Sequence, residues 1–106
     1  AILSHAGVVI LSGRCRQLQL KITPEAQEFI KEKYQKIYVS LEKEEAEARF
    51  EPAVFAGSPI SISLYDFYKI GDVEVYVLKD TFSSVEVFLV EYQSHKYLDV
   101  HAELLA

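Results

Sequence analysis

Apolar and polar residues alternate along much of the second half of the chain, and this period of two restricts that half to β-strands. Val73, Val75 and Val77 would share one face of an extended segment, and the same spacing recurs after residue 84. Successive side chains of a strand point to opposite faces, so each segment can bury one face in a core. We expect strands at residues 60–70, 73–78, 85–92 and 96–100.

Turn-forming residues separate these segments. Gly71-Asp72 lies between two alternating runs, which is a strong signal for a two-residue hairpin turn with a positive φ at Gly71. A Gly-Ser-Pro sequence at 57–59 predicts another turn, and polar residues at 80–84 and 93–95 indicate two more.

One helix is expected early in the chain. Thr23 is a good N-cap, and Pro24 suits the first helical position, where no amide hydrogen is needed. Spacings of three and four place four apolar residues on one face: Ala26, Phe29, Ile30 and Tyr34. The helix should end near residues 33–35, and at about three turns it needs tertiary packing to be stable.

The segment after the helix changes to strand character. Residues 37–41 predict a strand, whereas the charged segment 42–49 contains good helix formers and could continue as a short helix. Residues 50–55 are expected to be extended. Pro52 lacks a backbone donor, which places this segment at a sheet edge or a strand start.

The size and composition of the chain suit one domain with one core. The chain has 106 residues, and 50% of them are apolar. The expected elements make it a mainly β protein, of the α+β class, with one short amphipathic helix.

The N-terminal segment and the charge balance argue against several classes of protein. The apolar run within residues 1–11 is far shorter than the ~20 residues of a membrane span, and residues 7–11 predict an edge strand that ends at Ser12-Gly13. A net charge of −5 opposes binding to nucleic acid. Cys15 is the only cysteine, so no internal disulfide can form, which fits a cytoplasmic protein.

No grouping of residues predicts catalysis, and we expect neither an enzyme nor a cofactor. The chain has no Gly-x-Ser-x-Gly motif, and its isolated glycines form no phosphate-binding loop. His95 and His101 would share one strand face with Asp99, but a stable metal site needs three or four converging ligands, so we interpret them as surface residues. The acidic residues within 42–51 lack the spacing of a calcium loop and indicate a solvated segment.

Seven aromatic residues on the C-terminal strands have two interpretations. Half-buried strand partners are the more common role, and an exposed binding or dimer surface is the alternative. The seven residues are Tyr65, Phe67, Tyr68, Tyr76, Phe88, Tyr92 and Tyr97.

The order of short motifs resembles a known family. The sequence KITPEA at 21–26, followed by FIKEK at 29–33, is similar to the opening of HesB/IscA-like proteins, the A-type iron–sulfur carriers. The later motifs more closely resemble an offshoot, the small HesB-like proteins with a Cys-Cys or Cys-selenocysteine motif. These later motifs lie at residues 37–41, 50–54, 57–59 and 70–77.

The resemblance implies a division of the chain and a fold. It covers a HesB-like domain at 20–101, which leaves an N-terminal extension at 1–19, expected to be an edge strand, and a tail at 102–106. The implied fold is a HesB-like β-sandwich or distorted barrel.

The resemblance also places a reactive loop at which this chain departs from the family. The thiol or selenol pair should fall at Ala46-Glu47-Ala48, just before Arg49, Phe50 and Pro52, and no cysteine is there. The Cys-Gly-Cys tail pair of the iron–sulfur carriers is absent as well. Because thiolates are the ligands that hold such clusters, the implied fold carries over without the cluster or its redox chemistry.

Three functions remain open at this point. The first is a non-enzymatic HesB-like domain with a structural or protein-binding role. The second is an iron–sulfur or redox carrier whose Cys or selenocysteine is substituted in this chain, and the third is a small-ligand-binding β-domain. Because HesB-like proteins tend to self-associate, we also expect a homodimer or higher oligomer that uses the apolar face around Phe88, Val90 and Tyr92.

Overall fold

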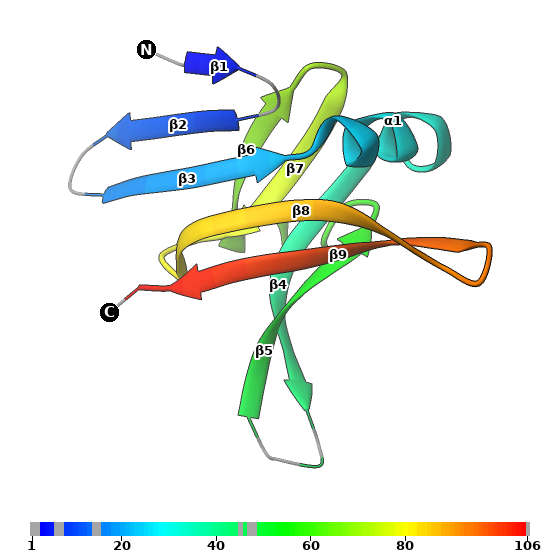
Figure 1. Cartoon of the computed structure of the whole chain (residues 1–106). Coiled ribbons are helices and arrows are strands. Elements are labelled where there is room, and N and C mark those ends of the chain that lie inside the picture. The colour runs from blue at the N-terminus through cyan, green and yellow to red at the C-terminus, as the bar shows by residue number, and fades with distance from the viewer. Residues whose placement is uncertain (1–2, 6–7, 14–15, 45, 47–48, 106) are drawn as a thin grey trace.

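The computed structural model describes residues 3–5, 8–13, 16–44, 46 and 49–105. Within them the chain is mainly β, with two sheets and no closed barrel (Figure 1). The five-stranded sheet A has the order β1-β2-β3-β8-β9, and the four-stranded sheet B has the order β5-β4-β7-β6. The strands of sheet A are β1 (Leu3–His5), β2 (Val8–Gly13), β3 (Arg16–Ile22), β8 (Phe82–Tyr92) and β9 (His95–Leu104). The remaining elements are α1 (Pro24–Lys33), β4 (Lys36–Glu44), β5 (Arg49–Ala56), η1 (Ile62–Leu64), β6 (Tyr65–Ile70) and β7 (Val73–Leu78).

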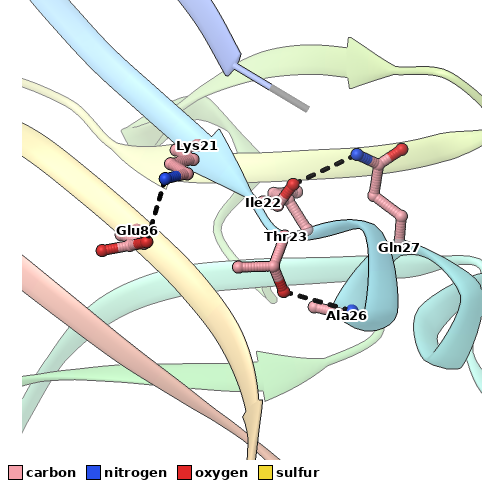
Figure 2. Close-up of polar contacts among 6 residues, drawn as sticks. All are labelled: Lys21, Ile22, Thr23, Ala26, Gln27 and Glu86. Atoms are coloured by element: carbon pink, nitrogen blue, oxygen red, sulfur yellow. Dashed lines mark hydrogen bonds and ion pairs between the residues drawn. The ribbon is translucent and has the colours of Figure 1, made fainter. Parts of the chain in front are cut away.

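Helix α1 lies in the chain between β3 of sheet A and β4 of sheet B. It begins where the sequence predicts, and Figure 2 shows the polar contacts at its start. The hydroxyl of Thr23 accepts a hydrogen bond from the Ala26 amide at 3.3 Å, and the Gln27 side chain donates to the Ile22 carbonyl at 3.1 Å. The amide of Thr23 also donates to the carbonyl of Val87 in β8, at 3.1 Å. The N-terminus of the helix is therefore held to sheet A.

The helix buries a narrower face than the periodicity predicts. Ala26, Phe29 and Ile30 are buried, as expected. Tyr34 is 40% exposed, because the helix ends at Lys33 and Tyr34 is its C-cap. Its ring lies at the edge of Phe29, with 5.9 Å between ring centroids.

A single core fills the space between the sheets and the helix. The alternation that predicts β7 is confirmed, since Val73, Val75 and Val77 are all buried. The other large, fully buried side chains come from both sheets and the helix: Leu20, Ile22, Ile30, Ile37, Val39, Ile70, Val85 and Val87. No helix among the described residues is long and apolar enough to cross a membrane.

The charged segment 42–49 is not helical in its described residues. β4 continues to Glu44, and β5 begins at Arg49, so the two strands form a hairpin. Backbone pairing of Glu42 with Glu51 and of Lys43 with Phe50 outweighs the weak helix preference of the segment. Pro52 lies in β5, an outer strand of sheet B, which confirms the expected edge position.

Three C-terminal boundaries differ from the prediction. Residues 62–64 form a 3₁₀ turn, so the strand expected from residue 60 begins at Tyr65. β8 begins at Phe82 and not after residue 84, because the Phe82 side chain is buried in the core. β9 extends from His95 to Leu104, so 102–104 belong to a strand and not to a fraying tail.

The expected N-terminal edge strand is paired on both sides. β2 covers 8–13, which includes residues 8–11 of the prediction, and Gly7 lies outside the described residues. It pairs with both β1 and β3, so β1 is the outer strand. The strand also continues through Ser12 and Gly13, which were predicted to end it.

Candidate functional site

The candidate site is the end of the β4–β5 hairpin, where the family resemblance places the reactive loop. β7 pairs with residues 36–39 of β4, and beyond them β4 pairs only with β5. The two-stranded end of the hairpin therefore extends away from the rest of sheet B (Figure 1). Of the reactive-loop positions, Ala46 is an exposed turn residue, whereas Glu47 and Ala48 lie outside the described residues.

The remaining reactive-loop positions lie on β5. The guanidinium of Arg49 forms an ion pair with the Glu51 carboxylate at 2.8 Å, and both side chains are about half exposed. Phe50 lies opposite Lys43 and is 61% exposed, while Pro52 lies opposite Leu41 and is half-buried.

A shallow hollow lies on the hairpin. It has a volume of about 350 Å³ and is lined by Glu42, Lys43, Glu51 and Pro52. Glu42 and Glu51 are directly opposite each other across the two strands, which places two like charges side by side. Lys43 and the Arg49 ion pair lie beside them, so the hollow has a mixed, solvated charge.

These side chains can bind but offer no evident reaction. The described part of the hairpin from Leu41 to Pro52 carries carboxylates, cations and one exposed aromatic ring, with no thiol, imidazole or hydroxyl group. Among the described residues, no three His, Cys, Asp or Glu side chains lie close enough together to hold a metal ion. An iron–sulfur cluster requires thiolate ligands, so the residues present do not fit one.

The two C-terminal histidines are far apart. His95 and His101 lie six residues apart on β9, which separates them by about 20 Å along the strand. Asp99 accepts a hydrogen bond from the Val100 amide at 2.8 Å. The two histidines therefore cannot share a metal ion with Asp99.

The seven predicted aromatic residues are all absent from the fully buried core, and they separate into three groups. The register places Tyr65, Phe67 and Tyr76 on the face of sheet B opposite the buried valines, and Tyr68 on the core side. Phe88, Tyr92 and Tyr97 lie on the outer face of sheet A.

Two further aromatic residues, which the prediction missed, complete the row on sheet B. Tyr38 stacks on Phe55 with 4.9 Å between ring centroids, and Tyr38 is also in register with Tyr76. Tyr76 in turn contacts Phe67 at 5.2 Å. The alternation of Tyr38 with Ile37 and Val39 was the available signal, because it places Tyr38 on the face away from the core.

The predicted association surface lies on the outer face of β8. Phe88 and Val90 are half-buried, and Tyr92 is 64% exposed. Across the strand pair these residues face Asp99, Tyr97 and His95 of β9. The surface is therefore apolar in part and bordered by ionisable groups.

Comparison with known proteins identifies a family. The sequence model of the CC/Se motif containing family matches residues 18–102. This chain belongs to that family. No curated protein and no solved structure matches the chain significantly.

Within the region that matches the CC/Se motif containing family, this chain has no cysteine. Cys15, the single cysteine of the sequence, precedes residue 18 and lies outside the described residues.

Proposed function

We propose that this member of the CC/Se motif containing family is a non-enzymatic, HesB-like domain with a structural or protein-binding role. The observation that carries the proposal is the lack of any cysteine within residues 18–102. Soft thiolate ligands are what iron–sulfur clusters require, and one thiol outside the domain cannot replace them. A single cysteine also suits a reducing, cytoplasmic compartment, which is part of the proposal.

Reconstitution with iron and sulfide tests this function. The purified chain should bind no stoichiometric iron or acid-labile sulfide and should show no charge-transfer absorbance in the visible range. A stable cluster on the unaltered chain would contradict the proposal. In that case Cys15→Ser would show whether Cys15 residues of two chains share the cluster.

The main alternative is an iron–sulfur or redox carrier whose Cys or selenocysteine is substituted in this chain. The exposure of Ala46 and Phe50, which border the expected positions of the pair, supports it. The double variant Glu47→Cys, Ala48→Cys restores a thiol pair, and Lys69→Cys with Asp72→Cys places two thiols elsewhere as a control. Cluster formation by the first variant alone would favour the carrier. A small-ligand-binding domain has less support, because three of the four residues that line the hollow are charged.

We further propose that the chain forms a homodimer or higher oligomer through the outer face at Phe88, Val90 and Tyr92. Light scattering at high micromolar protein should give at least a dimer mass. Phe88→Lys or Val90→Lys should dissociate it, because a charge in an apolar interface loses its hydration. A monomer mass for the unaltered chain would refute self-association, and an intact oligomer in both variants would place the interface elsewhere.

A further inference from the structure

Strand β9 is an open edge of sheet A. It pairs with β8 on one side, and no strand of the described chain pairs with it on the other. The strand has ten residues, His95 to Leu104, and contains neither proline nor glycine. A long edge strand without these residues presents unpaired backbone groups to a second chain.

Two hydrogen bonds show which residues of β9 face the open edge. The carbonyl of Val87 accepts from Thr23, so the backbone of Val87 faces away from β9. Val100 is the partner of Val87, so the backbone N–H and C=O of Val100 form no hydrogen bond with β8 and point to the open edge. In agreement, the Val100 amide donates to the Asp99 carboxylate at 2.8 Å. By alternation, the backbone N–H and C=O groups of Leu98 and Ala102 also point to the edge.

Asp99 and His101 on β9 can form a donor–acceptor pair with a second copy. If two β9 strands run antiparallel and Val100 faces Val100, then Asp99 of each copy lies opposite His101 of the other. A carboxylate accepts the N–H of an imidazole, and this pair occurs twice by symmetry. Both side chains are exposed on the outer face and therefore free to meet.

The neighbouring registers are unfavourable. A shift that centres the pairing on Asp99 sets two Asp99 carboxylates opposite each other. A shift that centres it on His101 sets Asp99 opposite Glu103 twice. Like charges directly opposite each other destabilise a strand pair, so the register centred on Val100 is preferred over both.

We propose that two copies of the chain join edge to edge through β9, antiparallel and centred on Val100, to form one continuous sheet from both copies of sheet A. This inference rests on the proposed self-association but assigns it a different surface, the edge of β9 in place of the outer face at Phe88, Val90 and Tyr92, together with a register. In the single chain Asp99 occupies the open amide of Val100, and in the dimer Asp99 turns to His101 of the second copy. The Val100 amide then donates to the second chain.

Charge reversal and charge exchange test the pairing. His101→Glu places a carboxylate opposite Asp99 at both symmetric positions and should raise the dissociation constant about tenfold or more. The double variant Asp99→Lys, His101→Glu places a lysine opposite each new glutamate and should recover the dimer. Sedimentation velocity measures both effects, and thermal unfolding of each variant checks the fold, because residue 101 also lies opposite Glu86 within the chain.

Amide hydrogen exchange of the unaltered chain gives a second readout. The Leu98, Val100 and Ala102 amides should exchange more slowly as protein concentration rises, because they enter the new ladder. A dimer that resists His101→Glu, or whose edge amides exchange freely, overturns the edge pairing. If Val90→Lys alone dissociates the dimer, self-association stands and the outer face forms the interface. A monomer at every concentration overturns both proposals.

Discussion

Gly71 shows how one backbone angle restricts the choice of residue. It has a φ of +59° at the first central position of the β6–β7 turn, as the sequence predicts. A Cβ there would also lie 3.4 Å from the Gln27 side-chain oxygen. Gly71→Val should therefore lower the free energy of unfolding by about 1–3 kcal/mol, because β-branched residues avoid positive φ.

Urea denaturation of Gly71→Val measures this cost, and Asp72→Ala is the matched control. Asp72 occupies the other central position of the turn and forms only an exposed ion pair with Lys31 at 3.3 Å. Its loss should change stability by about 0.5 kcal/mol or less. Equal stability of Gly71→Val and the unaltered chain would show that the turn tolerates a side chain at residue 71.

Tyr68 differs from the other six aromatic residues of the predicted set, because it alone lies on the core side of sheet B and packs against the core. Burial on the core side of sheet B and, to a smaller extent, the nearby Asp66 charge raise the pKa of its phenol from 10.0 to about 12. Because the pKa is higher in the folded chain, Tyr68 contributes stability that is fully present below pH 10 and is lost as the pH rises toward about 12.

Ultraviolet titration of phenolate absorbance should therefore show a late ionisation step that belongs to Tyr68. Tyr68→Phe should remove that last step and reduce the fall in stability between pH 10 and about 12. Tyr97→Phe is the control, since Tyr97 is 49% exposed. If Tyr97→Phe and not Tyr68→Phe removed the late step, the assignment of the raised pKa to Tyr68 would be wrong.

At the scale of elements, the β8–β9 hairpin forms without the residues that its turn prefers. Gln93 and Ser94 have φ angles of +49° and +69°, the pair of positive angles of a type I′ turn. Asn-Gly is the preferred sequence for such a turn. Because it is absent, the sequence predicted a turn at 93–95, one residue longer than the two-residue turn at Gln93 and Ser94. The adjacent strands, and not the turn residues, hold this conformation.

Replacing the turn residues should stabilise the protein. Gln93→Asn with Ser94→Gly relieves two strained positions and should raise the free energy of unfolding by about 0.5–1 kcal/mol. Urea denaturation measures the gain. Lys79→Asn with Asp80→Gly is the control, because only one of these two residues, Asp80, has a positive φ. A loss of stability in the 93–94 variant would mean that these side chains do more than permit the turn.

At the scale of the whole molecule, two parallel strand pairs hold together segments that are distant in sequence. β3 pairs with β8, and β4 pairs with β7. Helix α1 lies between β3 and β4 in the chain, and its residues Ala26 and Ile30 are buried in the core that both sheets share. The β4–β5 hairpin extends from the scaffold that these strand pairs and the helix form.

The sequence alone determined the elements whose signals are local. Thr23 and Pro24 begin the helix, Gly71 forms the turn, and the valines of β7 face the core, because capping, positive φ and alternation act over a few neighbouring residues. The position of Pro52 at a sheet edge was predictable for the same reason, since it follows from one missing amide hydrogen.

Tertiary structure decided what depends on partners distant in sequence. Residues 42–44 became strand because β5 pairs with them, and 102–104 became strand because β8 does. The row of aromatic rings through Tyr38 joins four strands whose order no local pattern contains. The edge position of β9 follows from the same strand order, because hydrogen bonding between strands is a non-local interaction that a sequence pattern permits but does not assign.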